Sequence, residues 1–355
     1  MKTGDAADRI RSNAGLAPVA IDPAGEGRVF WADMGRHPLK ESKHLYSFKR
    51  LVEQGRIGET FTSGLSVLDD ESLFCNGLLP SGLIFHISRC GSTLTAKALA
   101  RPEGNVMISQ GGPLQRGFWA HLTDDWRKPA MADPRTLVRL RSLIFALTRP
   151  RVGTERRVFV KFISWNILYL DLIARAFPGI PALFLYRNPA EVIATIKTET
   201  TAALLARGSR QAAFLTGHTA AETQGMDDAA YLASCYANYL RKVLYSNAGV
   251  ACVNYRDLNA DSFERIVNVG LDYAAGEHEL ALMREQFVYD SKDDARMPRN
   301  YNPAQEAPLS LLTPQERERI DRKCGHLMSS LDRSPLNLFA FNSESRLEDV
   351  REASV

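Results

Sequence analysis

The sequence predicts an α/β fold built on a parallel, doubly wound sheet. From Gly82 onward, short and almost continuously apolar runs alternate with longer stretches of helical length. Such apolar runs are typical of parallel strands covered on both faces, and the alternation is typical of helical crossover connections. The expected strands are Leu83–Ile87, Val106–Ile108, Val158–Ile163, Ala182–Tyr186 and Val250–Val253.

Helices are expected between these strands, at Ser92–Ala100, Pro134–Thr148, Trp165–Phe177, Pro189–Ala206 and Ala229–Tyr245. In doubly wound sheets, ligands bind beyond the carboxyl ends of the strands. The residues that directly follow each strand are therefore the first candidates for a functional site.

Two segments precede this domain. Residues 1–27 are rich in Gly, Ala, Asp and Pro without periodicity, so we expect a disordered N-terminus. Residues 28–81 carry short apolar pieces and are expected to form an extension packed on the main domain, residues 82–342. Residues 343–355 are polar again and predict a flexible C-terminus.

The charge balance, the cysteines and the apolar spans of the sequence exclude several classes of function. The 44 Lys and Arg residues nearly balance the 41 Asp and Glu residues, so no overall field for nucleic acid or an anionic membrane is expected. The five cysteines are dispersed without a CxxC pair, which argues against a disulfide framework or a structural zinc site. No signal-peptide pattern and no long apolar span is found, so we expect a cytoplasmic protein.

The first motif follows the first strand of the domain, at Ser88–Leu94. The chain turns through Gly91 and opens a helix with Ser92 and Thr93, so that backbone N–H groups and hydroxyls face outward as an anion cradle. Arg89 adds a positive charge. The GxxxxGK[ST] pattern of kinases and ATPases is missing. The alternative interpretation is a capped helix that binds no ligand.

The second motif is another strand that runs into a helix. Asn188 is the expected N-cap, Pro189 the first helical residue and Glu191 the third. Arg187 ends the strand, and Thr195 lies almost two helical turns beyond the cap on the same side. These two residues are placed to grip one phosphate, although capping alone would also explain the pattern.

Together the two motifs resemble those of the sulfotransferases that use 3′-phosphoadenosine-5′-phosphosulfate (PAPS), which read roughly [KR]-[SG]-G-[ST]-[ST] and R-N-P-x-[DE]-V followed by Ser or Thr. The resemblance implies a P-loop-like sulfotransferase fold in which Arg187 and Thr195 bind the 3′-phosphate. It also implies that the first loop holds the 5′-phosphosulfate through Arg89, Cys90, Gly91, Ser92, Thr93 and Leu94.

Two further elements match the family in the same order. Val253–Leu258 is similar to its Y-[ED]-D-[LM] element, which implies that Tyr255 contacts the adenosine. Lys161 stands 26 residues before Arg187, where the family often has a lysine facing the reacting group. The resemblance therefore implies Arg89 and Lys161 as the catalytic residues, opposing charge on the leaving phosphate. No metal is expected.

The general base is unassigned, because no histidine follows Lys161 where the family often has one. His86 is expected to be a core residue, and His218, in the loop-like stretch 207–227, is the more open candidate.

Cys90 is expected to serve the turn rather than to act as a nucleophile. Trp165 is as consistent with a core position as with stacking on a ligand.

Two alternatives remain open: a P-loop kinase or other phosphotransferase, and a nucleotide-binding relative without catalysis. The acceptor is expected to be a small molecule with a hydroxyl or amine, and its identity is not encoded in these motifs. Arg296 and Arg299 are read as a mixed-charge surface loop rather than as the family's late basic loop.

Overall fold

A computed structural model describes residues 3–197, 201–289 and 309–340 of the chain. Its main sheet is parallel, with the strand order β5-β6-β4-β7-β8, which confirms the α/β class expected from the sequence. The bounds of these strands differ from the predicted ones by at most two residues: β4 (Gly82–His86), β5 (Asn105–Ser109), β6 (Arg157–Lys161), β7 (Ala182–Tyr186) and β8 (Val250–Asn254).

A second sheet lies in the N-terminal part. It is antiparallel, with the order β1 (Leu16–Asp22), β2 (Arg28–Asp33) and β3 (Thr60–Gly64), and it follows helix α1 (Thr3–Ser12). Over residues 3–27 the structure thus differs from the disorder expected for residues 1–27. Ile10 and Leu16 are fully buried there. The prediction rested on the average Gly- and Asp-rich composition, which does not report these regularly placed apolar positions.

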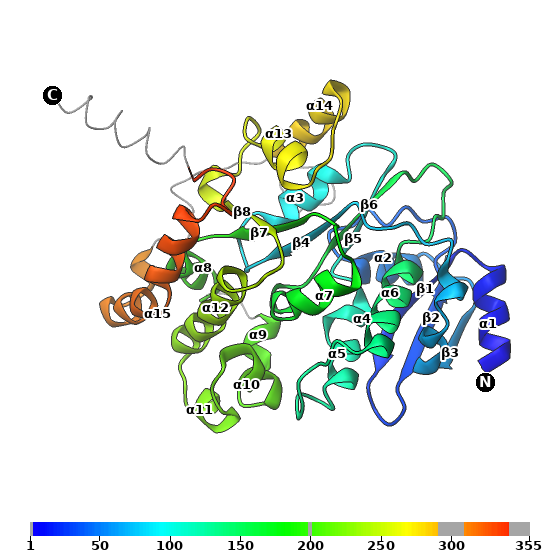
Figure 1. The fold of residues 1–355 in the computed structure, drawn as a ribbon, viewed down its shortest axis with the longest axis horizontal. Coiled ribbons are helices and arrows are strands. Elements are labelled where there is room, and N and C mark those ends of the chain that lie inside the picture. Colours follow the sequence, from blue (N-terminus) through cyan, green and yellow to red (C-terminus); the bar gives the residue numbers. More distant parts are fainter. Residues whose placement is uncertain (1–2, 198–200, 290–308, 341–355) are drawn as a thin grey trace. The chain divides into compact units, whose positions relative to one another are not determined.

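The chain divides into two compact units. The first contains Met1–Phe85, Ser92–Ile180 and Gly276–Asn300. Helices cover both faces of its strands β4–β6, with α3 and α14 on one face and α6 and α7 on the other (Figure 1). Its helices after α1 are α2 (His44–Glu53), α3 (Ser92–Leu99), α4 (Gly112–Gln115), α5 (Gly117–Leu122), α6 (Pro134–Leu147), α7 (Leu170–Ala176) and α14 (Glu277–Glu285). Short 3₁₀ helices are η1 (Leu65–Asp69), η2 (Glu71–Phe74), η3 (Ser164–Tyr169) and η6 (Gln286–Val288).

The second unit contains His86–Gly91, Pro181–Ala275 and Tyr301–Val355. Strands β7 and β8 pair in parallel, and α8 packs against α12 and α15. Its elements are α8 (Pro189–Ile196), α9 (Ala202–Leu205), α10 (Arg210–Thr216), α11 (Ala220–Gln224), α12 (Asp228–Leu244), η4 (Tyr255–Asp257), α13 (Phe263–Arg265), the π-helical η5 (Ile266–Gly270), η8 (Leu309–Leu311) and α15 (Pro314–Arg333).

Two predicted helices are subdivided in the structure. The stretch Trp165–Phe177 begins as the 3₁₀ helix η3, in which Asn166 N donates to Ile163 O, and only then continues as α7. The stretch Pro189–Ala206 contains α8 and α9.

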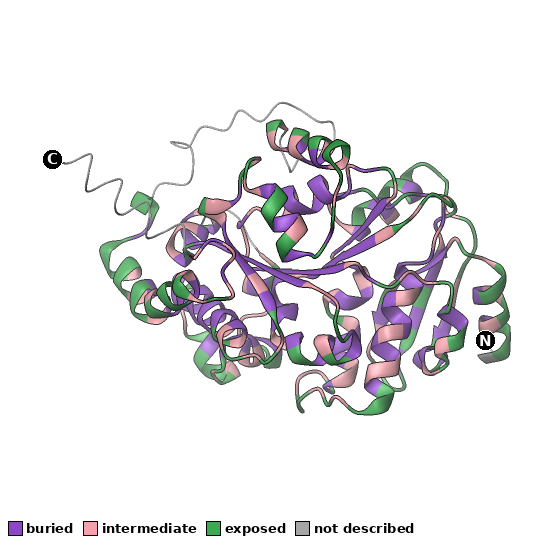
Figure 2. Ribbon diagram, turned by 45° about the horizontal axis from the view of Figure 1, so that its top comes forward, coloured by how far each residue is buried: buried purple, intermediate pink, exposed green. Residues whose placement is uncertain are grey.

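The strands of the main sheet form the centre of the core. All residues of β4, β5 and β7 are buried, in agreement with the continuous apolar runs of the sequence (Figure 2). Within the described ranges, no helix is long and apolar enough to cross a membrane.

Candidate functional site

The loop after β4 has a backbone that favours glycine at one position. Gly91 has a φ of +78°, and a Cβ atom there would lie 2.3 Å from Leu258 Cδ2 and 3.1 Å from Tyr255 Cδ2. Arg89, with a φ of +55°, also adopts the left-handed conformation. The chain therefore turns tightly against η4, and an L side chain at position 91 would meet both strain and collision.

The turn is stabilised by its own polar groups. Ile87 N donates to Leu185 O of β7 (3.1 Å), and the Cys90 thiol donates to Ile87 O (Sγ to O, 2.9 Å). Cys90 is 1% exposed. His86 is 6% exposed, and its Nδ1 lies 2.7 Å from Ile87 O. Cys90 and His86 thus have structural contacts in the turn.

Arg187 links the second motif to the first. Its guanidinium NH1 donates to the carbonyl oxygen of Arg89 (3.4 Å), and its Nε donates to Glu191 Oε2 (2.7 Å). The residue is 7% exposed, and its Cζ lies 4.4 Å from the centre of the Tyr255 ring. A guanidinium stacked on an aromatic ring and bonded on two edges is held in one orientation.

Tyr255 therefore contacts two of the predicted site elements. Its ring lies under Arg187, and its Cδ2 is the second-nearest atom to the Cβ position that Gly91 leaves empty. Thr195, on α8, donates its hydroxyl to Glu191 O (2.8 Å). A phosphate that took a hydrogen bond from Thr195 would replace this intrahelical bond.

A network at the end of α15 holds the strand ends that carry Arg187 and Tyr255. Asp332 Oδ1 accepts from Tyr186 OH (2.7 Å) and from Asn254 Nδ2 (2.9 Å). Tyr186 and Asn254 are the residues immediately before Arg187 and Tyr255. Asp332 thus joins the carboxyl ends of β7 and β8.

Sequence reasoning missed Tyr236, which lies on α12 and is 2% exposed. Burial raises the pKa of its phenol well above the usual range, and a hydrogen bond with Ser88 opposes this. Burial also lowers the pKa of Arg89, against the influence of Tyr236, yet a guanidinium stays protonated at neutral pH. The only available signal was the run of tyrosines on α12, which also indicates an ordinary core helix.

The remaining predicted loop residues open α3 in the first unit. Ser92 and Thr93 are the first two residues of α3; Ser92 is 5% exposed and Thr93 is partly exposed. The Leu94 side chain is buried, with 3% of its surface exposed, which leaves its backbone as the group that can face a ligand.

Lys161 ends β6 in the first unit. It is 1% exposed and pairs in register with Ser109, the last residue of β5. Gln110 N donates to Lys161 O (2.7 Å), and Ser109 Oγ donates to Ser42 O of the N-terminal extension (2.7 Å). The extension therefore contacts the carboxyl end of β5, beside the strand that carries Lys161.

The other candidates lie as follows. Trp165 is 5% exposed and donates its indole N–H to Gln115 O (2.9 Å), so it is part of the core. His218 is partly exposed between α10 and α11. Arg296 and Arg299 lie outside the described residues.

Over residues 3–197, 201–289 and 309–340, no group of three or more His, Cys, Asp or Glu side chains is placed to hold a metal ion.

Solved structures that are similar to this chain include a sulfotransferase. The crystal structure of sulfotransferase STF9 from Mycobacterium avium aligns with a TM-score of 0.43 and 13% sequence identity, over 75% of this chain and 81% of that chain. No family model matches the chain. No curated protein matches it either. We therefore base the functional proposal on this chain's own residues.

Proposed function

We propose that this protein is a sulfotransferase that moves a sulfuryl group from PAPS to a hydroxyl or amine of a small acceptor molecule. The observation that carries the proposal is the position of Arg187. Its guanidinium is stacked on Tyr255 and bonded to the carbonyl of Arg89. Three motifs that are far apart in the sequence thus meet around one cation.

These residues fit a nucleotide with phosphates at both the 5′ and the 3′ position. The left-handed Gly91 allows the loop to pass close to a ligand, and the N–H groups at the start of α3 are the usual donors to a 5′-phosphate. Arg187 and Thr195 supply a cation and a hydroxyl for a second phosphate. Tyr255 offers an aromatic face to the adenosine, although Arg187 already stacks on its ring.

PAPS supplies the sulfuryl group and a phosphate that gains negative charge as it leaves. The protein's contribution is then to position the reactants and to oppose that charge with fixed cations. Arg89 acts as an electrostatic clamp, since its guanidinium cannot serve as a proton donor at neutral pH. Lys161, buried at the end of β6, is the second cation that we assign to this role.

A transfer assay tests the proposal. Radiolabelled PAPS is incubated with a mixture of small hydroxyl and amine acceptors, with and without a metal chelator. We expect label in an acceptor, unchanged by the chelator. Lys161→Met keeps the apolar stem of the side chain and removes the charge, so transfer should fall about 100-fold while nucleotide binding persists.

Two results would reject the proposal in different ways. Phosphate transfer from ATP that requires Mg²⁺ would identify a phosphotransferase. Tight binding of PAPS without transfer to any acceptor would favour a nucleotide-binding relative that has no catalytic activity.

A further inference from the structure

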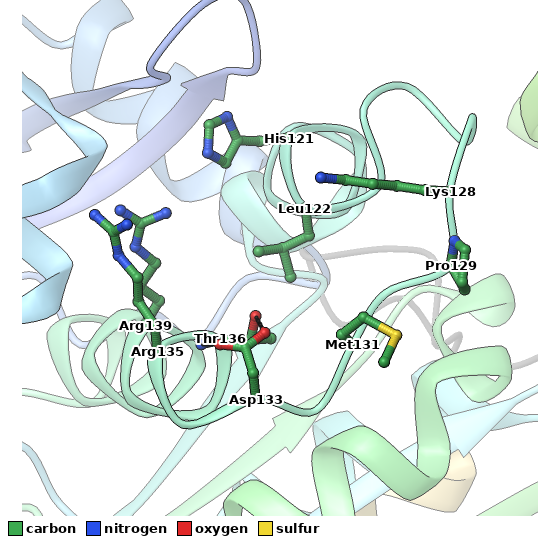
Figure 3. A pocket seen from close by; sticks show the side chains of 9 residues that line it. All are labelled: His121, Leu122, Lys128, Pro129, Met131, Asp133, Arg135, Thr136 and Arg139. Atoms are coloured by element: carbon green, nitrogen blue, oxygen red, sulfur yellow. Dashed lines mark hydrogen bonds between the residues drawn. The ribbon is translucent and has the colours of Figure 1, made fainter.

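A separate pocket of about 230 Å³ lies in the first unit (Figure 3). Helix α5, the segment after it and the first turns of α6 line this pocket, and none of its residues belongs to the predicted nucleotide site. The Lys128 side chain extends toward His121, and Arg135 and Arg139 rise from the first turns of α6 (Figure 3).

The two arginines share one carboxylate. Arg139 donates from Nε (2.6 Å) and NH2 (3.1 Å) to Asp69, and Arg135 donates to the same group from Nε (3.2 Å) and NH2 (2.8 Å). Within the described part of the chain, no group accepts a hydrogen bond from Lys128 Nζ or from NH1 of either arginine. These three nitrogens of pocket-lining residues thus keep hydrogens for a further acceptor.

Asp133 lines the pocket with a carboxylate that already accepts two hydrogen bonds. Asp133 caps α6 and accepts from Thr136 N (3.0 Å) and Thr136 Oγ1 (2.8 Å). Counting Asp69 as well, three cations (Lys128, Arg135 and Arg139) face two carboxylates, so a net charge of +1 remains.

Burial first, and the neighbouring cations after it, lower the pKa of His121. Burial lowers its pKa, a hydrogen bond from its Nδ1 side to Pro23 O (3.3 Å) opposes this, and Arg139, Lys128 and Arg135 lower it further. Three cations therefore act on one imidazole, and a bound anion would compensate their repulsion.

We propose that this pocket binds a tetrahedral oxyanion, either free phosphate or sulfate or the phosphate or sulfate group of a small molecule. Guanidinium NH1 groups and an ammonium are the donors that such oxygens prefer. The volume of about 230 Å³ exceeds the ~30 Å³ that one water occupies in the liquid, so an attached small group also has room. The proposal does not depend on the transferase assignment, because the two sets of residues do not overlap.

Calorimetric titration of the full chain with inorganic phosphate provides the first test. Adenosine 3′,5′-bisphosphate is kept at saturation to mask the nucleotide site, and chloride at equal ionic strength is the control. We expect saturable binding that is about ten-fold weaker in Lys128→Gln. Lys49→Gln removes an exposed lysine of α2 that does not line the pocket and should leave binding unchanged.

Histidine ring NMR locates the anion. Phosphate should raise the pKa of His121, because the anion screens Lys128, Arg135 and Arg139 while Asp133 stays on its helix cap. Glucose 6-phosphate and glucose are titrated for comparison. Binding of glucose 6-phosphate that is tighter than that of inorganic phosphate, with no binding of glucose, would identify an ester as the ligand. Equal binding of the two phosphates would identify the free anion. Binding that Lys128→Gln does not weaken, or a His121 titration that phosphate does not move, would overturn the proposal.

Discussion

Gly91 shows how one residue combines two constraints. Its φ of +78° costs an L residue about 1–2 kcal/mol, and the missing Cβ leaves space that Leu258 and Tyr255 closely border. Gly179 has the same kind of backbone, with a φ of +77°, but apart from its two chain neighbours no residue has an atom within 4 Å of its Cβ position. A substitution at Gly179 therefore tests backbone strain alone, and one at Gly91 tests strain together with steric contact.

We predict that Gly91→Ala lowers both stability and nucleotide binding, and that Gly179→Ala lowers stability alone. Both variants should lose about 1 kcal/mol of unfolding free energy through strain. Only Gly91→Ala should also weaken adenosine 3′,5′-bisphosphate, by about ten-fold or more, because Tyr255 must move. Denaturant unfolding and calorimetry measure the two effects. Equal binding by both variants would contradict the described loop.

The sequence predicts some residue roles and hides others. The Asn188 cap and the strand-end position of Arg187 are visible because they depend on local chain geometry. The contacts of Tyr236 with Ser88 and of Asp332 with Tyr186 join residues that are about 150 positions apart. Such pairs depend on tertiary packing, so periodicity marks Tyr236 only as a core residue.

At the scale of elements, the end of α15 holds β7 and β8 together through Asp332. We predict that Asp332→Ala destabilises the protein by about 1–3 kcal/mol, because Tyr186 OH and Asn254 Nδ2 lose their acceptor. Nucleotide binding should weaken as well, since the next residue of each strand end is Arg187 or Tyr255. Asp321→Ala, an exposed position of the same helix, is the control and should change neither quantity. Unaltered binding in Asp332→Ala would show that the network does not position the site.

The N-terminal extension contains a buried carboxylate with a defined pH response. Burial would raise the pKa of Glu41, but hydrogen bonds from His37 (3.2 Å) and Ser47 (2.5 Å) outweigh it and lower the pKa to about 2. Because the folded pKa lies below the ordinary value, this stabilisation is present above about pH 4.5 and is lost as the pH falls toward 2.

We therefore predict that Glu41→Gln is less stable than the parent protein at neutral pH, by up to about 3 kcal/mol. The difference should shrink between about pH 4.5 and pH 2, where the parent loses its charge. Glu53→Gln, at an exposed position of α2, should show no such window. Urea unfolding across this pH range measures it, and a difference that does not depend on pH would be inconsistent with an ionised, paired Glu41.

At the same scale, the strands were more predictable than the ends of the chain. Continuous apolar runs placed all strands of the main sheet within two residues, because a buried parallel strand needs apolar side chains on both faces. For α1 and β1, by contrast, a few buried positions such as Ile10 and Leu16 decide the structure, and the average composition of the segment does not report them.

For the whole molecule, the sequence predicted the α/β class and a set of nucleotide-binding candidates, but not the acceptor. Donor binding relies on short motifs at strand ends, whose local geometry recurs. An acceptor pocket depends on the shape that distant segments make together, and no short pattern in this chain encodes it. The hydrogen bond from Ser109 to Ser42 joins the extension to the carboxyl end of β5 and goes no further than that.

We propose that Arg187 recognises a 3′-phosphate, and one calorimetric comparison tests this most directly. Adenosine 3′,5′-bisphosphate and adenosine 5′-monophosphate are titrated into the parent protein, Arg187→Ala and the exposed-site control Arg175→Ala. We predict that the bisphosphate binds about 10–100-fold tighter than the monophosphate in the parent and in Arg175→Ala. In Arg187→Ala this ratio should fall to about one. A ratio that survives the loss of Arg187, or a preference of the parent for ATP over the bisphosphate, would contradict the account.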